Sequence, residues 1–235
     1  MDLPNNTPDL HQFDHIVFFT GAGLSAESGI PTYRGKGGIW ETYRYEEHAC
    51  QRAFDKDPEK VWDFHEIRRE FISHCIPSEG HKVIAEIEKV KPLTTVITQN
   101  IDGLHQRAGS NRVVELHGSL WRIRCDKEGI VYESHKIPLT NRRCSCGAYL
   151  RPDIVWFEDP LKEEEIFKAI DAINQSDLFI SVGTSAVVFP AAQLPLYAIQ
   201  KNVPTIEINI EKTLMTSMYQ YQIQGTASEV LRKLW

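Results

Sequence analysis

Two short segments contain polar side chains of the types needed to bind and react with a nucleotide. His117 stands next to Gly118, and histidine is the side chain best suited to proton transfer near neutral pH. Gln99, Asn100 and Asp102 form a second polar group, which follows an apolar run. A lone histidine is more often structural, and a polar loop of this kind can simply cap a helix. Each segment alone therefore leaves its role open.

A glycine-containing turn adds a candidate phosphate site. The stretch 21–35, GAGLSAESGIPTYRG, follows an apolar run at 16–19 that predicts a short buried strand. Gly21 and Gly23 allow a tight turn and a close approach of the backbone to a ligand. Backbone N–H groups and a helix dipole can hold a nucleotide phosphate at such a turn. The standard dinucleotide fingerprint has a third glycine where this chain has Ala26, so an ordinary strand-to-helix turn explains the stretch equally well.

Apolar runs alternate with amphipathic segments along the chain. Strands are predicted at 16–19, 94–97, 178–182 and 205–210, and helices at 81–89, 163–173 and 228–235. This alternation predicts an α/β fold, a Rossmann-like doubly wound parallel sheet with helices on both faces. Ligands bind at the carboxyl ends of strands in such sheets, so the polar groups that follow the strands are expected to share one crevice.

Two segments depart from this alternation of strands and helices and are predicted to form a smaller inserted lobe. The chain is expected to be a single catalytic domain, 1–235, with its core at about 13–39, 78–120 and 153–235. The small lobe is expected from inserts at about 40–77 and 121–152. The first insert is rich in charged and aromatic residues and is predicted to be helical. The second contains three cysteines and strand-like pieces, and is expected to resemble a zinc ribbon.

The composition is that of a globular protein, with 42% hydrophobic and 25% charged residues. A net charge of −6 argues against nucleic-acid binding through a general basic surface. No pattern of a signal peptide or a membrane span is recognised, so no membrane association is expected. The odd number of cysteines, five, then predicts reduced thiols and a cytoplasmic location.

The order of the motifs is more specific than any one of them. GAGLSAESGIP, TQNIDGLHQRAG, ELHGS, a cysteine-bearing insert, RPDIVWFED, VGTSAVVFPAA and INIEKT follow one another from about residue 13 to the C-terminus. This order resembles the sirtuin family of NAD-dependent protein deacylases, and the compact length is similar to that of its bacterial members. The resemblance implies NAD as cofactor and acylated lysine side chains of proteins or peptides as partners.

The resemblance also implies a reaction. Nicotinamide leaves C1′ of the ribose, the acyl oxygen of an acyl-lysine attacks that carbon, and the products are free lysine and an O-acyl-ADP-ribose. His117 would act as general base on a ribose hydroxyl, and Asn100 is the second implied catalytic residue. The implied cofactor-binding residues are Gly21, Ala22, Gly23, Glu27, Arg34, Trp40, Gln99, Asn100, Ile101, Asp102, Gly183, Thr184, Ser185, Asn209, Ile210, Glu211 and Ala227.

Substrate residues follow from the same resemblance. The peptide is expected to bind as an added strand, with Val155, Phe157 and Val187 in its site. Members of the family commonly read Phe-Gly-Glu where this chain has Phe-Glu-Asp from Phe157. Sirtuins that remove acidic acyl groups carry a Tyr-x-x-Arg pair, and here His65 and Arg68 occupy those positions. Arginine can bind a carboxylate with two hydrogen bonds, which adds desuccinylation to deacetylation as a candidate activity. The alternative is a surface arginine on a solvated helix.

The cysteines of the second insert form an incomplete metal motif. The family usually has two Cys-x-x-Cys pairs, whereas this chain has Cys125 without a partner and then Cys144 and Cys146. These three are candidate zinc ligands, with Asp126, Glu128 or His135 as the fourth. The alternative is a lobe that folds without metal, in which the thiols are merely buried.

Two other functions remain open at this point. The first is an NAD-dependent ADP-ribosyltransferase or NAD glycohydrolase on the same fold. The second is an NAD-sensing module without catalytic activity. The intact His117 favours the deacylase over the first function, and the presence of Asn100, Asp102 and His117 together argues against the second.

Overall fold

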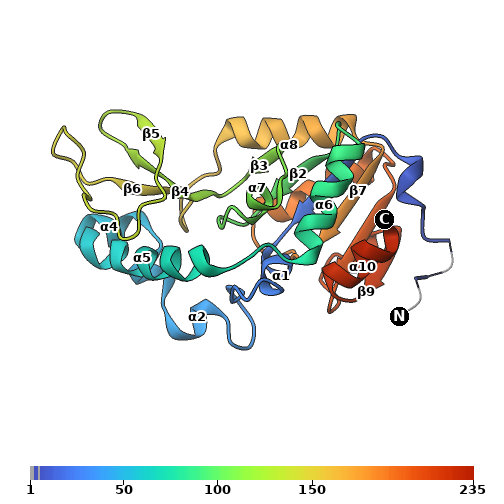
Figure 1. The fold of residues 1–235 in the computed structure, drawn as a ribbon, viewed down its shortest axis with the longest axis horizontal. Coiled ribbons are helices and arrows are strands. Elements are labelled where there is room, and N and C mark those ends of the chain that lie inside the picture. The colour runs from blue at the N-terminus through green and yellow to red at the C-terminus, as the bar shows by residue number, and fades with distance from the viewer. Residues whose placement is uncertain (1–2, 5) are drawn as a thin grey trace.

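A computed structural model describes residues 3–4 and 6–235, and its largest element is a six-stranded parallel sheet (Figure 1). Every neighbouring pair in this sheet is parallel. The strand order is β3 (Val113–Glu115), β2 (Thr95–Thr98), β1 (Ile16–Thr20), β7 (Leu178–Val182), β8 (Thr205–Asn209) and β9 (Tyr221–Gln224). The chain fills one half of the sheet from β1 to β3 and the other from β7 to β9, so the order reverses between β1 and β7. The predicted doubly wound fold is confirmed.

Helices cover both faces of this sheet because its central strands are apolar on both sides. Ile16 and Phe18 of β1 pack toward α6 (Glu79–Val90) and α10 (Ala227–Leu234). Val17 and Phe19 pack on the opposite face, toward α8 (Glu163–Gln175) and α9 (Leu194–Gln200). The four predicted strands and the three predicted helices are present; the strand at 178–182 has the predicted ends, and the others are shifted at one or both ends. The strands β3 and β9 were not predicted.

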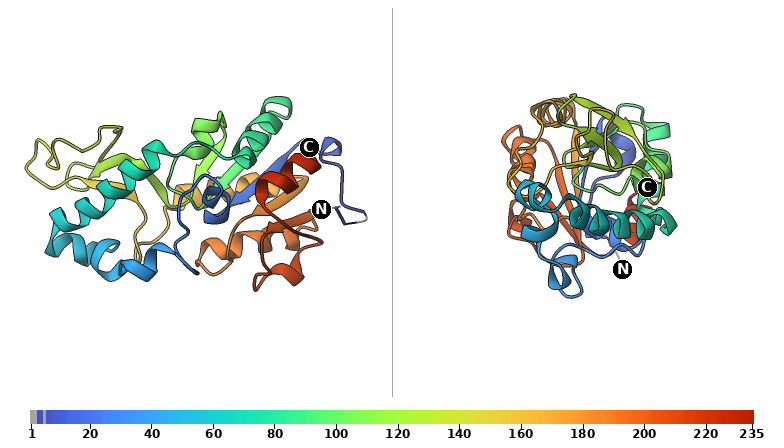
Figure 2. Two further views of the ribbon diagram at one scale, coloured as in Figure 1. Left: turned by 60° about the horizontal axis from the view of Figure 1, so that its bottom comes forward. Right: turned by 90° about the vertical axis from the view of Figure 1, so that its left-hand side faces the viewer.

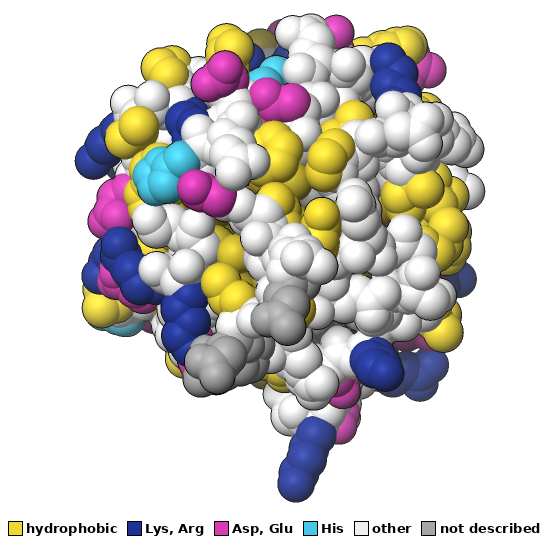
Figure 3. All heavy atoms as spheres, turned by 90° about the vertical axis from the view of Figure 1, so that its right-hand side faces the viewer, with side chains coloured by type: hydrophobic (Ala, Val, Ile, Leu, Met, Phe, Trp, Pro, Cys, Tyr) yellow, Lys and Arg dark blue, Asp and Glu magenta, His cyan; other side chains and the backbone are white. Residues whose placement is uncertain are grey.

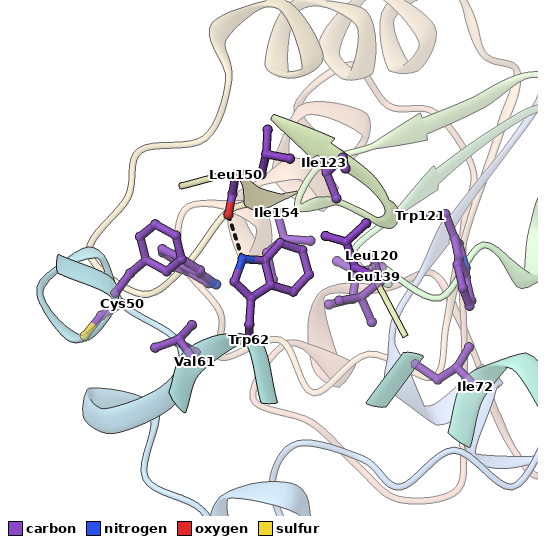
Figure 4. Packing of buried hydrophobic residues seen from close by; sticks show 14 of the residues in the cluster. Cys50, Val61, Trp62, Ile72, Leu120, Trp121, Ile123, Leu139, Leu150 and Ile154 are labelled. Atoms are coloured by element: carbon purple, nitrogen blue, oxygen red, sulfur yellow. Dashed lines mark hydrogen bonds between the residues drawn. The ribbon is translucent and has the colours of Figure 1, made fainter. Parts of the chain in front are cut away.

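The two inserts pack against each other at one end of an elongated molecule, and the C-terminus lies near the other end (Figures 1 and 2). The first insert forms α2 (Ile39–Thr42), α3 (Tyr45–His48), α4 (Gln51–Lys56) and α5 (Pro58–His74). The second belongs to an antiparallel sheet of β5 (Ile130–Glu133), β4 (Gly118–Cys125) and β6 (Arg151–Ile154). Trp62 of α5 is fully buried between them, and its Nε1 donates to the carbonyl of Leu150 at 2.6 Å (Figure 4). One apolar cluster therefore joins the two inserts.

The remaining elements are short. They are α1 (Ala22–Ala26) and α7 (Leu104–Ala108), with 3₁₀ turns at Leu10–Gln12, Ala191–Gln193 and Thr216–Met218. Over the residues that the structure describes, no helix combines the length and apolarity needed to cross a bilayer. On the face at the terminal end of the molecule, basic and acidic side chains are interspersed among apolar and polar ones (Figure 3).

Candidate active site

A cleft of about 720 Å³ lies at the carboxyl ends of the central strands and extends to the helical insert. It is placed where the strand order reverses, as expected for a doubly wound sheet. The predicted residues that line it are Gly21, Ala22, Gly23, Glu27, Arg34, Trp40, His65, Arg68, Gln99, Asn100, Ile101, His117, Val155, Phe157, Gly183, Thr184, Ser185, Val187, Asn209, Ile210, Glu211 and Ala227. Among the described residues, the predicted set outside this lining consists of Asp102 and the three cysteines.

The glycines of the first turn are needed for contact between two loops. A Cβ on Gly21 would lie 2.7 Å from the carbonyl oxygen of Gly183, and one on Gly23 would lie 2.8 Å from the Cα of Gly183. The backbone N–H of Gly23 donates to that same carbonyl at 2.8 Å. Gly21 and Gly23 were predicted to allow the approach of a ligand, and in the structure they also allow a backbone contact between the β1 and β7 loops. This contact brings the two halves of the sheet together at the cleft.

His117 is held as a neutral base. Its Nδ1 lies 2.8 Å from the carbonyl oxygen of Gln99, and a carbonyl only accepts, so Nδ1 carries the proton. Nε2 is therefore the unprotonated nitrogen. Burial lowers the pKa of His117, while the hydrogen bond to Gln99 opposes that shift. A neutral imidazole with a free Nε2 can accept a proton from a group bound in the cleft.

Asn100 is 5% exposed, and its side chain is fixed by two hydrogen bonds. Its Nδ2 donates to the carbonyl of Gly21 at 2.9 Å and to Oγ of Ser25 at 3.0 Å. Both amide hydrogens are thereby used, so Oδ1 is the atom left to accept from a ligand. Ser25, which sequence reasoning missed, in turn donates to Asp102 at 2.8 Å. The only signal for Ser25 was its place in the glycine-containing stretch.

Asp102 does not line the large cleft itself, but Ala22, Asn100 and Ile101 line both that cleft and the small cavity beside it that Asp102 borders. The Asp102 carboxylate accepts from Ser25 and from the backbone of Leu104 at 2.9 Å. Burial raises its pKa despite these bonds. Asp102 therefore acts on the cleft through Ser25 and Asn100.

The loops that follow β2, β7 and β8 form one side of the cleft and are joined by short polar contacts. Gln99 donates to Oγ1 of Thr184 at 2.8 Å, and Asn209 donates to the carbonyl of Thr184 at 2.9 Å. Glu27 accepts from the backbone N–H of Ala227 at 2.7 Å and so caps the start of α10. Glu27 borders the cleft, but its carboxylate is engaged in that cap, a role that was not predicted.

The far end of the cleft is formed by the helical insert. His65 is 1% exposed, and its Nε2 accepts from Nε1 of Trp156 at 3.2 Å. Burial lowers the pKa of His65 well below its usual value, so it is neutral there. The guanidinium of Arg68 lies over the ring of Tyr33, and its Nη2 donates to the Tyr33 hydroxyl at 3.0 Å. Tyr33 and Trp156 both line the cleft and were not predicted.

Trp40 belongs to an aromatic group on the insert side of the cleft. Its ring lies 5.8 Å from that of Tyr33, 6.1 Å from Phe64 and 5.6 Å from Phe157. Phe64 and Phe157 also line the cleft. Trp40 was predicted to bind the cofactor, and it lies in the same wall of the cleft as Phe157, which was predicted to bind the peptide.

The segment predicted to bind the peptide is already part of a backbone network. The N–H of Val155 donates to the carbonyl of His117 at 2.9 Å, and that of Phe157 donates to Ala49 at 3.0 Å. Glu158 has a φ of 77°, the left-handed conformation that favours glycine. Its carboxylate lies 3.2 Å from Arg52 of α4.

The three cysteines lie together in the second insert, away from the cleft, with Cys125 at the end of β4 and Cys144 and Cys146 in a turn before β6. Their sulfur atoms are all within 4.8 Å of one another. A hydrogen bond from the backbone of Cys146 lowers the pKa of Cys144 to about 7. In the described part of the chain, none of the predicted fourth ligands, Asp126, Glu128 and His135, belongs to this group. Asp126 pairs with Arg124, and His135 stacks on Trp121. Three converging thiols suit a thiophilic metal such as zinc.

Comparison with known proteins agrees with this geometry. The Sir2 family model matches residues 21–190. A protein of Pyrobaculum aerophilum named NAD-dependent protein deacylase 2 is 50% identical over 94% of this chain and 89% of its own length. The crystal structure of a Sir2 homologue with NAD has a TM-score of 0.89 and 44% identity, covering 96% of this chain and 90% of its own. A Sir2 mutant with deacetylated p53 peptide and 3′-O-acetyl ADP-ribose has a TM-score of 0.84 and 31% identity, covering 96% and 94%.

Proposed function

This chain belongs to the Sir2 family and is an NAD-dependent protein deacylase, and from that premise we propose that its cleft removes acyl groups from lysine with His117 as the base. When bound, NAD supplies the ADP-ribose that accepts the acyl group. The observation that carries the proposal is the fixed tautomer of His117, whose Nε2 is left unprotonated by the bond to Gln99.

Other residues of the chain bind and position the reactants. Asn100 presents Oδ1 because both of its amide hydrogens are used, and so it can orient a hydroxyl or a water in the cleft. The Gly21, Gly183 and Asn209 loops form the nucleotide side. The Val155–Phe157 and Val187 segments form the opposite side, where the peptide would lie. Aromatic rings on that side exclude water from the reacting atoms.

A product analysis by mass spectrometry tests the proposal. The protein is incubated with NAD and a panel of acyl-lysine peptides. We expect free lysine peptide together with O-acyl-ADP-ribose. ADP-ribosylated protein or free ADP-ribose, with the acyl-peptide intact, would instead assign the transferase or glycohydrolase reaction.

We further propose that Arg68 admits acidic acyl groups such as succinyl beside acetyl. Its guanidinium borders the cleft and is held by a hydroxyl and a ring face, so it can still pair with a carboxylate. Arg68→Met is expected to raise KM for a succinyl-peptide about tenfold and to spare the acetyl-peptide. Arg44→Met, at an exposed arginine, is the matched control. Equal effects on both peptides, or no desuccinylation by the parent, would contradict this role.

Zinc is proposed as a structural metal of the small lobe, held by Cys125, Cys144 and Cys146. Bound there, it would crosslink the end of β4 to the turn that carries the other two cysteines. We also propose a reducing compartment and a cytoplasmic location, because none of the five cysteines takes part in a disulfide.

A further inference from the structure

Trp121 of β4 connects the small lobe to the loop that carries Asn100. The backbone N–H of Leu120 donates to the carbonyl of Ile101 at 2.9 Å, and Nε1 of Trp121 donates to the carbonyl of Asp102 at 2.6 Å. Two successive carbonyls of the β2–α7 loop are therefore bound by two successive residues of β4. Trp121 is 8% exposed, and it lines neither the cleft nor the small cavity that Asp102 borders.

The loop also lies directly against the indole ring at Gly103. A Cβ on Gly103 would lie 2.7 Å from Cδ1 of Trp121 and 2.9 Å from its Nε1. Gly103 has a φ of 73°, so the backbone conformation favours glycine as well. Because no other side chain fits between the loop and the ring, a change in the position of the indole must move the loop.

The small lobe holds the indole in one position. Arg69 of α5 is fully buried, and its Nη1 donates to the carbonyl of Leu120 at 2.5 Å, while its Nη2 donates to that of Ser134 at 2.9 Å. The guanidinium carbon of Arg69 lies 5.4 Å from the ring centre of Trp121. The ring of His135 stacks on the indole at a centroid distance of 5.4 Å. Both inserts therefore contribute to the placement of Trp121.

The bond from the indole ends on the residue that orients Asn100. The Asp102 carboxylate accepts from Ser25 at 2.8 Å, and Oγ of Ser25 accepts from Nδ2 of Asn100 at 3.0 Å. Without the indole N–H, the buried carbonyl of Asp102 would have to turn toward another donor, because an unpaired buried carbonyl is unfavourable. That rotation would displace the carboxylate on the same residue.

We propose that Trp121 is a positioning residue for the reaction, whose indole N–H keeps the hydrogen bonds of Asp102, Ser25 and Asn100 in place. Through it, the small lobe determines the geometry of the cleft without touching a ligand. The functional part of this inference rests on the proposed role of Asn100, whereas the structural part does not.

Two matched variants test the functional part. Trp121→Phe removes the indole N–H. Trp62→Phe removes an equivalent bond, also 2.6 Å long, from a buried indole to the carbonyl of Leu150, and Trp62 lies outside both cavities. We expect a similar fall in the urea midpoint for both variants. Trp121→Phe should also lower kcat about tenfold with little change in KM for the peptide, while Trp62→Phe keeps the parental kcat. Equal kcat values in the two variants would overturn the positioning role.

An isosteric replacement covers the case in which Trp121→Phe does not fold. Benzothienylalanine at position 121 keeps the two fused rings and replaces the N–H by sulfur, so it removes the hydrogen bond and retains the packing. We expect the same loss of kcat, about tenfold. A parental kcat with this residue would show that packing alone is required, and would contradict the role of the N–H.

Nitrogen NMR tests the structural part without any assay of activity. Both side-chain amide hydrogens of Asn100 are bonded, so we expect them to exchange slowly with solvent in the parent and in Trp62→Phe, and faster in Trp121→Phe. Unchanged exchange in Trp121→Phe would overturn the proposal, even in a parent without activity. A parent that forms no O-acyl-ADP-ribose would contradict the proposed deacylase reaction instead, which keeps the two failures apart.

Discussion

Mild acid is expected to destabilise the fold through its buried histidines. His105 is 2% exposed, and burial lowers its pKa from 6.5 to about 3. The unfolded chain regains the ordinary pKa, so below pH 6.5 the unfolded state binds a proton that the folded state does not. The contribution of His105 to stability is therefore complete above pH 6.5 and is lost progressively as the pH falls toward 3.

The size of this effect follows from the pKa difference. Each pH unit below the ordinary pKa costs about 1.4 kcal/mol, so about 2 kcal/mol is lost at pH ~5 through His105 alone. Burial also lowers the pKa of His65 and His81, and these residues add to the loss in the same direction. A domain with a stability of about 5–15 kcal/mol would lose a large fraction of it.

Urea unfolding followed by tryptophan fluorescence, at about pH 7.5 and about pH 5, measures the loss. His105→Gln removes the titrating group, so the difference in free energy of unfolding between the two pH values should shrink by about 2 kcal/mol. His74→Gln, at a side chain 77% exposed, should leave that difference unchanged. If His105→Gln kept the parental pH dependence, His105 would not be the buried neutral histidine described here.

Three other changes have defined outcomes. His117→Ala is expected to keep NAD binding and to lower turnover about 10²–10⁴-fold, the range for a lost general base; calorimetry and kinetics measure the two, and near-parental turnover would contradict the role of His117. Gly183→Ala is expected to cost about 1–3 kcal/mol in urea unfolding, because its Cβ would lie 2.6 Å from the backbone nitrogen of Leu24. An unchanged midpoint would mean that the two loops can separate. Cys144→Ser is expected to lower the zinc content of protein purified without chelator; elemental analysis that finds the parent itself free of zinc, yet folded and active, refutes the metal site.

The order of strands and helices could be predicted from the sequence because central strands of a parallel sheet are buried on both faces. Such strands read as continuous apolar runs, as at 178–182, and need no tertiary information. The strands β3 and β9 escaped prediction because they lie at the edges of the sheet. Tyr221–Gln224 is mostly polar, and its pairing with β8 is what makes it a strand.

The candidate site divides in a similar way. The sequence by itself identified the segments at the strand ends, since a doubly wound sheet brings those ends together, and it identified the family through their order. Only the tertiary structure showed that Asp102 accepts a hydrogen bond from Ser25, that Glu27 caps α10, and that Trp156 donates to the ring of His65. These roles depend on contacts between residues 77, 200 and 91 positions apart, and no local pattern encodes such contacts. The type of reaction could thus be predicted from residue types and their order. The tautomer of His117 and the orientation of the Asn100 amide were decided by tertiary contacts.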